Sequence, residues 1–394
     1  MEICKSELCS GCTACAAVCP KKCIEFVSDE EGFLRPSVNE ESCIKCGRCI
    51  KVCPINKEKL ITNNETEAYA MVNCDDEIRF ESTSGGVFTS LCQWIFERGG
   101  VVFGAAYDEN FKVVHIEADN LEKISKLRGA KYSQSDLQDT FIKVKERLCE
   151  DKFVLFSGTP CQVWGLHSFL GKEYEKLILV DLICHGVPSP EVFKKYIEYR
   201  SAKDAEGNKP TNINLRSKVT GWPTYSIKFD YEKECYSVKN GGDPFLRGFI
   251  GNVFLRQSCY QCKFKGVNRI SDFTLGDYWG VWNQHPDFHD FKGTSLVLVH
   301  SKKAKDCLSS LSSQIRYKKV DALTSLKDNP SALVSFEEPK IRKEFFDSYK
   351  TEDFNDLLNR IYPKPVPKKP SFSQKAISFI KRGVKKVLYI IKKK

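Results

Sequence analysis

Two stretches of sequence decide the fold of the N-terminal region: CSGCTACAAVCP, residues 9–20, and CIKCGRCIKVCP, residues 43–54. Each stretch places three cysteines two residues apart and a fourth after three more residues, and proline follows directly. Thiolates at this spacing wrap a short loop around one metal cluster, so that neighbouring backbone amides can donate to its sulfurs. The repeat therefore predicts two metal clusters within residues 1–57.

The spacing of both repeats is that of bacterial two-cluster ferredoxins, in which the fourth cysteine of each run binds the other cluster. We therefore assign one 4Fe-4S cluster to Cys9, Cys12, Cys15 and Cys53, and the second to Cys43, Cys46, Cys49 and Cys19. A pair of zinc sites is the alternative, but zinc sites rarely show two copies of this spacing with prolines. Cys4 and Cys23 lie outside the pattern and are interpreted as small hydrophobic residues.

Cysteine usage and hydrophobicity indicate the compartment. The 394-residue chain has 19 cysteines, and 10 of them fall within the first 53 residues. Disulfides are rare in the cytosol, so this crowding points to metal or redox chemistry. The N-terminus lacks the pattern of a signal peptide, and no apolar run reaches the roughly 18 residues of a membrane-spanning helix. We therefore expect a cytoplasmic protein.

Positive charge is concentrated at the C-terminal end. Residues 363–394 contain 11 of the 61 Lys and Arg residues and no Asp or Glu, which leaves 50 basic and 51 acidic side chains elsewhere. The net charge of +10 therefore belongs to this end, and the rest of the chain is close to neutral. A near-neutral body argues against nucleic-acid binding.

Residues 371–394 have the pattern of an amphipathic helix. At about 100° per residue, one side carries Ile377, Ile380, Val384, Val387, Leu388 and Ile391, and the other carries Lys381, Arg382, Lys385, Lys386, Lys392 and Lys393. This profile is typical of a helix in a membrane interface, with its cations toward anionic headgroups. We expect peripheral contact with the cytoplasmic face of the inner membrane, and the alternative is a tail that packs on the body or on a partner.

The central part of the chain alternates strand-like and helix-like runs. Residues 87–97 have a helical apolar face, and the apolar runs of 101–107 and 112–118 flank turn residues, which predicts a hairpin. Residues 152–158 and 177–184 resemble buried strands, and each is followed by a helix-like segment. This order predicts an α/β domain with a mixed, partly parallel sheet.

Four cysteines of this region follow predicted strands or pair closely in sequence. Cys161 and Cys184 come directly after the two buried strands, and Cys259 and Cys262 are three residues apart. Loops at the carboxyl ends of neighbouring strands meet at one edge of a sheet, so the four thiols are candidates for a third 4Fe-4S cluster or a zinc site. Cys74, Cys92, Cys149, Cys235 and Cys307 are interpreted as core or surface residues.

Nucleotide-binding signals are weak. The chain has neither a GxGxxG after a strand nor a GxxxxGK[ST] segment. Ser84, Gly85 and Gly86 open the helix predicted over 87–97, and exposed amides at a helix start can hold a phosphate, although an ordinary helix cap explains Ser84 as well. Arg128 and Lys131 flank a glycine in a loop that suits an anionic ligand or simply faces solvent.

Six ordered motifs carry a family resemblance: STSGGVFTSL, RGAKYSQSD, FSGTPCQVWGL, DLICHGVPSP, SCYQCKFK and SDFTLGDYWG. From about residue 68 to residue 340 the chain resembles the beta subunits of coenzyme F-420 hydrogenases and formate dehydrogenases. The resemblance implies a flavoprotein that binds FAD, carries a 4Fe-4S cluster beside the flavin and exchanges a hydride with a deazaflavin coenzyme. Free-standing members of this family are often associated with surface-polysaccharide biosynthesis, which offers a metabolite as the alternative substrate.

The resemblance also implies roles for individual residues. Cys161, Cys184, Cys259 and Cys262 become the ligands of the third cluster, and the candidate flavin contacts are Ser84, Gly85, Gly86, Lys131, Ser157, Thr159 and Asp277. Tyr278 and Trp279 either lie near the isoalloxazine or fill the core. His185 is a candidate catalytic proton donor or a partner of the cluster, and a structural histidine is the alternative.

Together these patterns predict an α+β dicluster ferredoxin domain followed by an α/β flavin-binding domain with a mixed sheet and a C-terminal amphipathic helix. The predicted divisions are a ferredoxin domain (1–57), a linker (58–67), two parts of the flavoprotein domain (68–150 and 151–345), a helical and Pro/Lys-rich segment (346–370) and the basic helix (371–394). The predicted function is that of an oxidoreductase that passes electrons between its clusters and FAD, supplied by a redox partner protein or a small electron carrier. The alternative is a non-catalytic electron-transfer subunit.

Overall fold

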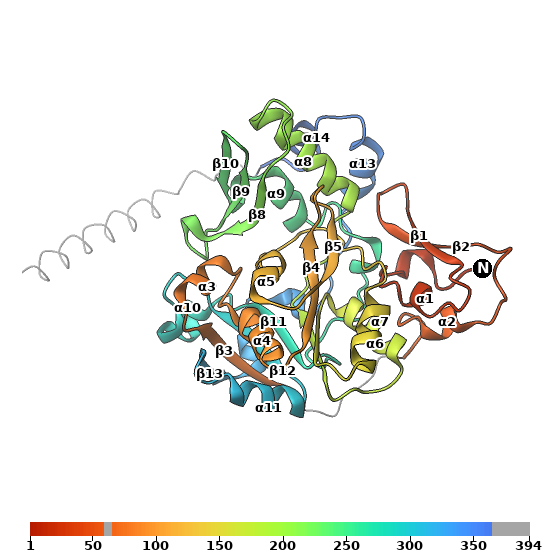
Figure 1. The fold of residues 1–394 in the computed structure, drawn as a ribbon. Coiled ribbons are helices and arrows are strands. Elements are labelled where there is room, and N and C mark those ends of the chain that lie inside the picture. The colour runs from red at the N-terminus through yellow and green to blue at the C-terminus, as the bar shows by residue number, and fades with distance from the viewer. Residues whose placement is uncertain (59–64, 365–394) are drawn as a thin grey trace, which may run out of the picture.

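The computed structural model describes residues 1–58 and 65–364, and a small cysteine-rich domain (residues 1–58) lies at one side of a larger α/β body (Figure 1). The predicted amphipathic helix over 371–394 and most of the predicted linker lie outside the described residues. Within the described ranges, no helix combines the length and the hydrophobicity needed to cross a membrane.

The cysteine-rich domain consists of short helices and one hairpin. Its elements are η1 (Ser6–Leu8), α1 (Ala14–Ala17), β1 (Ile24–Ser28), β2 (Leu34–Val38) and α2 (Arg48–Val52), and β1 pairs with β2 in antiparallel orientation. A left-handed residue precedes each α-helix, Thr13 with φ 61° and Gly47 with φ 71°. These residues turn the chain sharply between consecutive cysteines of each repeat.

A mixed sheet of eight strands, in the order β13-β3-β12-β11-β7-β6-β4-β5, organises the body. Its strands are β3 (Glu67–Asn73), β4 (Val101–Tyr107), β5 (Val113–Ala118), β6 (Val154–Ser157), β7 (Leu177–Leu182), β11 (Phe273–Asp277), β12 (Ser295–Val299) and β13 (Ile315–Val320). The four adjacent strands β11, β7, β6 and β4 pair with one another in parallel orientation. The remaining pairs in the sheet are antiparallel. The predicted hairpin, the two buried strands and the mixed sheet are therefore confirmed.

Helices cover both faces of this sheet. Side chains alternate along each strand, so apolar residues lie on both faces and pack against helices on each side. Val102 and Leu155 pack on one face with α4, α5 and α11, whereas Phe103 and Phe156 pack on the other face with α6 and α7. The helices are α3 (Asp76–Glu81), α4 (Val87–Phe96), α5 (Leu121–Leu127), α6 (Thr140–Cys149), α7 (Pro160–Leu170), α10 (Val281–Gln284), α11 (Lys302–Ser310) and α12 (Ala322–Ser325). The helix predicted over 87–97 is thus α4.

A second, antiparallel sheet of three strands lies beside the main one, at the top of Figure 1. It contains β8 (Asn212–Ser217), β9 (Ser226–Asp230) and β10 (Cys235–Lys239), and its helices are α8 (Pro190–Asp204), α9 (Pro244–Ile250), α13 (Ile341–Ser348) and α14 (Phe354–Ile361). Aromatic side chains form much of its core, including Tyr196, Phe245 and Phe354, whose rings lie face to face or tilted. This layer closes one side of the large cavity described below.

The cysteine-rich domain packs on the face of the main sheet that α6 and α7 cover. Cys12, Cys15 and Val52 belong to the same hydrophobic cluster as the core residues of those helices. A Cβ at Gly165 of α7 would lie 2.8 Å from the Cβ of Cys12, so only glycine permits this close approach. The cysteines are thereby held directly against the body rather than on a separate lobe.

Candidate functional site

Two cavities within the cysteine-rich domain gather the cysteines of the repeats. The first cysteine cavity is lined by Cys4, Cys9, Cys12, Cys15 and Cys53. The second cysteine cavity is lined by Cys19, Cys23, Cys43, Cys46 and Cys49. Each cavity contains the three cysteines of one repeat and the fourth cysteine of the other, which is the exchange that the spacing predicts.

Backbone geometry around these cavities suits thiolates. The amide of Lys45 lies 3.4 Å from the sulfur of Cys43, and the amide of Gly11 hydrogen-bonds to Cys9, which favours its thiolate form. Burial works in the opposite direction and raises the pKa of Cys12 to about 12. A buried thiol of this kind ionises when it binds a cation, so the donor set has the chemistry that an iron cluster requires.

Cys4 and Cys23, which the repeats do not include, also lie in these cavities. The sulfurs of Cys19 and Cys23 are 3.4 Å apart, and a hydrogen bond with Cys19 is the main cause that raises the pKa of Cys23 to about 11. A hydrogen bond with Cys4 lowers the pKa of Cys9 to about 5. Each extra cysteine therefore lies beside cysteines of the repeats, a position that spacing alone did not indicate.

A third cysteine cavity lies in the body and is lined by Cys161, Cys184, Cys259 and Cys262. Cys161 is the second residue of α7, Cys184 follows β7, and Cys259 ends η4 (Gln257–Cys259). Burial raises the pKa of Cys259 to about 12, and the cations Lys265 and Arg269 line the same cavity. The structure thus brings together the four thiols that the sequence assigned to one site.

No group of three or more His, Cys, Asp or Glu side chains in residues 1–58 and 65–364 is arranged around a position for a single metal ion. A 4Fe-4S cubane separates its four thiolates more than a single ion does, because each thiolate binds a different iron. Ligation of the three cysteine sets remains a prediction of the sequence.

The large cavity, of about 620 Å³, lies between the main sheet and the three-stranded layer. Of the candidate flavin contacts, its lining includes Ser84, Gly86, Lys131, Ser157, Thr159 and Asp277. Gly85 is not among the lining residues, because it packs behind the wall with its amide donating to the hydroxyl of Ser295 at 2.9 Å. The volume and the mixture of apolar and polar walls are those of a cofactor site.

The start of α4 presents free backbone amides to this cavity. Gly86, with φ 85°, is the residue before the helix, and no side chain caps the helix. The hydroxyl of Ser84 donates to the carbonyl of Thr294, so the interpretation of Ser84 as an ordinary helix cap is wrong. From behind, the buried ammonium of Lys218 donates to the carbonyl of Ser84, and burial lowers its pKa to about 7. Uncapped amides beside a buried cation favour an anionic ligand group.

Two cations of the loop over 128–135 also face the large cavity. The ammonium of Lys131 donates to the carbonyls of Leu127 and Arg128 at the end of α5, and burial lowers its pKa to about 7. Arg128 forms an ion pair with Glu81 at 2.7 Å. The loop is therefore held in place by its own cations and is not the simple solvated loop of the alternative interpretation.

The opposite wall carries an arginine that sequence reasoning missed. Arg216 of β8 lies 3.0 Å from Asp277, with its guanidinium 3.9 Å from the ring of Tyr225. Trp222 donates to Asp277 at 2.7 Å and stacks on Trp279, which lines the cavity. Tyr278 is fully buried instead, so the two aromatic residues have different roles. No motif or periodicity marks Arg216 in the sequence.

His185 and two cysteines form the boundary between the large cavity and the third cysteine cavity. Cys161, Cys184 and His185 line both cavities. The His185 ring packs against Phe249 and Phe336, and its Nδ1 lies 3.4 Å from the hydroxyl of Ser331. Burial lowers the pKa of His185, so the imidazole is neutral near pH 7. His115, a second buried histidine on the wall, was also missed by sequence reasoning.

Arg256 connects the cysteine-rich domain to the body. Its side chain is fully buried and donates to the carbonyl of Cys9 at 2.7 Å and to the side-chain oxygen of Gln134 at 2.8 Å. The guanidinium also lies 3.6 Å from the sulfur of Cys9 and lines the third cysteine cavity. Within the described residues, Arg256 has no carboxylate within ion-pair distance, and burial, which is the larger cause, lowers its pKa together with the nearby cation Arg35.

Comparison with known proteins gives two matches along the chain. Residues 8–57 match the 4Fe-4S dicluster domain, and residues 151–322 match the C terminus of the beta subunit of coenzyme F420 hydrogenase/dehydrogenase. No curated protein matches. A solved structure of the F420-reducing [NiFe] hydrogenase complex from Methanosarcina barkeri contains a chain with 19% identity and a TM-score of 0.48, over 75% of this chain and 93% of that one. The two domain matches confirm the resemblance predicted from the motifs.

Proposed function

We propose that this chain, which joins a 4Fe-4S dicluster domain to the C-terminal domain of the F420 hydrogenase/dehydrogenase beta subunit family, is a cytoplasmic iron-sulfur flavoprotein oxidoreductase. Its three cysteine cavities hold 4Fe-4S clusters, and its large cavity holds FAD. When bound, the clusters supply single electrons and the flavin combines them in a two-electron reaction.

The observation that carries this proposal is that the first cysteine cavity, the third cysteine cavity and the large cavity follow one another with shared walls. Ser10 lines the first, the third and the large cavity, and Ile55 lines the first and the third. Cys161 and Cys184 line both the third and the large cavity. Electrons move only between centres that lie close together, and this succession supports a route from the first cysteine cavity through the third to the flavin.

Side chains of the large cavity have separate tasks in this proposal. The amides at the start of α4, with Lys131, bind the pyrophosphate of FAD, because an uncapped helix start and a cation both favour anionic groups. Ser157 and Thr159 lie beside Cys161 at the end that adjoins the third cysteine cavity. His185, neutral and half-buried at that boundary, holds the proton that accompanies the transfer of electrons to substrate.

The substrate in this proposal is a deazaflavin coenzyme, as the matched domain suggests, or a metabolite of surface-polysaccharide biosynthesis. The deazaflavin needs a flat wall beside the flavin for its planar ring, and the metabolite needs polar side chains there. Arg216, between Tyr225 and Trp279, offers a charged and aromatic wall for that purpose. Turnover assays of the purified protein with each class of substrate distinguish the two.

Anaerobic purification followed by iron, zinc and flavin quantification tests the composition. We expect about 12 iron atoms and one FAD per chain, since three cubanes contain four irons each. About 8 iron atoms without flavin would indicate a ferredoxin fusion, and stoichiometric zinc would contradict the clusters. Clusters and flavin without turnover of any small molecule would instead favour the non-catalytic electron-transfer subunit.

The basic segment over 371–394 supports a further part of the proposal, reversible attachment to an anionic membrane surface. Cosedimentation of the full chain with vesicles that contain anionic lipid tests it, and a chain that ends at residue 370 is the control. Binding that persists in the shorter chain, or that ignores lipid charge, would contradict attachment through this segment.

A further inference from the structure

The second cysteine cavity is the most accessible of the three cysteine cavities. Cys46 is exposed, and Cys19 and Cys43 are half-buried. In contrast, Cys9, Cys12, Cys15 and Cys53 of the first cavity are all buried. An external protein that exchanges electrons with this chain therefore comes closest to a cluster at the second cavity.

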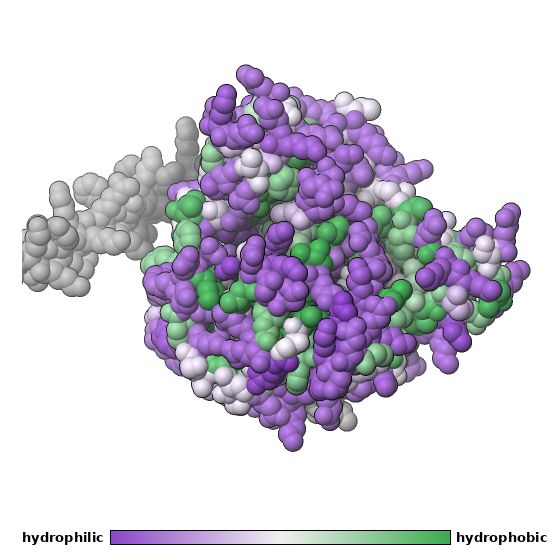
Figure 2. All heavy atoms as spheres, viewed as in Figure 1, coloured by the Kyte–Doolittle hydropathy of each residue, from purple (hydrophilic) through white to green (hydrophobic). Residues whose placement is uncertain are grey.

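Apolar side chains reach the surface around the second cavity. Ile44 is 58% exposed and lines the cavity between Cys43 and Cys46, and Ile50 on α2 is 40% exposed. Figure 2 shows that hydrophobic and hydrophilic residues both reach the surface at this end of the molecule. Small apolar centres with polar rims are typical of the small, transient interfaces of redox partners.

The rim of this surface is positively charged. The segments 9–24 and 42–57, which contain both cysteine repeats, have no Asp or Glu. Five cations of these segments are exposed, namely Lys21, Lys22, Lys45, Arg48 and Lys51. Lys21 and Arg48 line the second cavity directly, and no acidic residue does so. The carboxylate of Glu40, which faces Lys45, is paired with the N-terminal ammonium. None of the five cations forms an ion pair with a described residue.

We propose that this face, composed of Ile44, Ile50 and the five cations, is the docking surface for a small acidic protein that carries one electron at a time. The inference rests on the proposed function, because it requires a cubane in the second cavity. In the encounter, the reduced carrier loses one electron and the cluster gains it, and no bond or proton changes place. Opposite charge steers the carrier to this face and sets its orientation.

The test measures the second-order rate constant for reduction of the oxidised holoprotein by a reduced acidic ferredoxin, followed by bleaching of the cluster absorption. The variant Lys21→Glu/Arg48→Glu reverses two cations at the cavity. The matched control, Lys302→Glu/Lys327→Glu, makes the same change of net charge at exposed lysines outside the cysteine-rich domain. We expect a loss of about 10-fold or more at low salt for the first variant, and little change for the control.

Two further measurements separate docking from cluster chemistry. Salt should slow the wild-type reaction and have little effect on the Lys21→Glu/Arg48→Glu variant, because screening acts on the same charges. An uncharged reductant, photoreduced deazariboflavin, should bleach all three proteins equally. Equal ferredoxin rates in both variants would overturn the docking proposal alone. Absence of iron from the cysteine-rich domain would overturn the proposed function as well.

Discussion

Replacement of Arg256 by glutamine should lower the reduction potential of the cluster proposed for Cys9, Cys12, Cys15 and Cys53. The buried guanidinium lies 3.6 Å from the sulfur of Cys9 and has only neutral hydrogen-bond partners besides the cysteines. A buried cation without a carboxylate favours each added electron on the neighbouring cluster, because the electron supplies the missing negative charge. Glutamine preserves hydrogen bonding near Gln134 and removes the charge.

The magnitude follows from Coulomb's law. Electron density added to a cubane is spread beyond Cys9, so the separation of the two charges is about 6 to 8 Å. With an effective dielectric constant of about 20, one unit charge at that separation contributes about 2 to 3 kcal/mol. For a one-electron couple this corresponds to a decrease of roughly 100 mV in the midpoint potential on loss of the charge.

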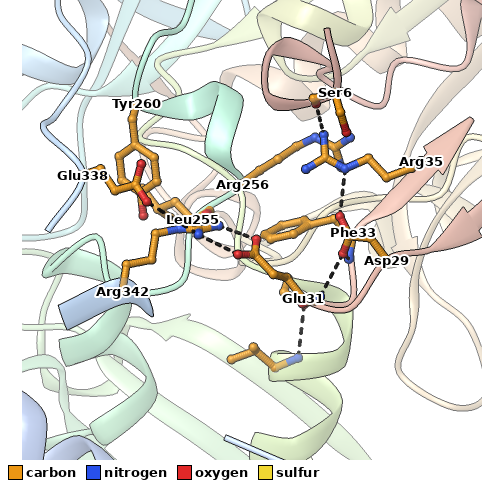
Figure 3. Close-up of polar contacts among 12 residues, drawn as sticks. Ser6, Asp29, Glu31, Phe33, Arg35, Leu255, Arg256, Tyr260, Glu338 and Arg342 are labelled. Carbon is orange, nitrogen blue, oxygen red and sulfur yellow. Dashed lines mark hydrogen bonds and ion pairs between the residues drawn. The ribbon is translucent and has the colours of Figure 1, made fainter. Parts of the chain in front are cut away.

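Redox titration of the holoprotein, monitored by electron paramagnetic resonance, measures the potentials of the individual clusters. The iron content is measured in the same samples, because the loss of a cluster could be mistaken for a shift of its reduction potential. The matched control is Glu31→Gln/Arg342→Gln, since Arg342 is buried at the same domain boundary but paired with Glu31 at 2.7 Å (Figure 3). This double variant removes an ion pair without a change of net charge. A full iron content with a shift below about 20 mV in Arg256→Gln would refute the reasoning.

Three other predictions test the remaining parts of the site. Cys259→Ser should remove about 4 of about 12 iron atoms and spare the rest, and an unchanged iron content would contradict the third cluster. Gly86→Ala should cost about 1 kcal/mol of stability, because Gly86 has φ 85°, and should also lower flavin content, whereas Gly171→Ala, at φ 68° in open space, should retain flavin. Burial lowers the pKa of His115 to about 4, from an ordinary value of about 6.5, so the folded state resists protonation and stability falls as the pH decreases through that interval. His115 should contribute about 2 kcal/mol to the loss of stability between pH 7 and pH 5 in denaturation experiments, and His115→Asn should reduce the loss by about that amount.

The cysteine sets were predictable from sequence because spacing limits where thiolates can lie. Cys9, Cys12 and Cys15 are too close in the chain to reach different sites, and the exchange of Cys19 and Cys53 follows from the repeat. Cys161 and Cys184 were predictable for a different reason, since both follow parallel neighbouring strands, β6 and β7. Periodicity could not predict the order of the strands or the three-stranded layer. It also could not predict where Cys259 lies relative to β6 and β7.

The charged residues that matter most were not predictable from spacing. Arg256, Arg216 and Lys218 are single cations in segments without periodicity, and each is distinguished only by burial among distant parts of the chain. The role of Ser84 was ambiguous, because a serine before a helix usually caps it. In the structure its hydroxyl instead donates to the carbonyl of Thr294. Cys4 and Cys23 were interpreted as small hydrophobic residues, because spacing does not reveal that they line the two cysteine cavities beside the repeats.

The contacts at the domain boundary determine how well electrons can pass between the two parts of the chain. Glu31, in the loop after β1, pairs with Arg342 (Figure 3), and its carbonyl accepts a hydrogen bond from the hydroxyl of Ser189. On the other side of the cysteine-rich domain, Lys263 donates to the carbonyls of Pro54 and Ile55. These bonds lie on both sides of the first cysteine cavity, so the domain cannot rotate about either one alone. A fixed domain keeps the distance between the first and third cysteine cavities constant, and the proposed relay through these two cavities requires a constant distance.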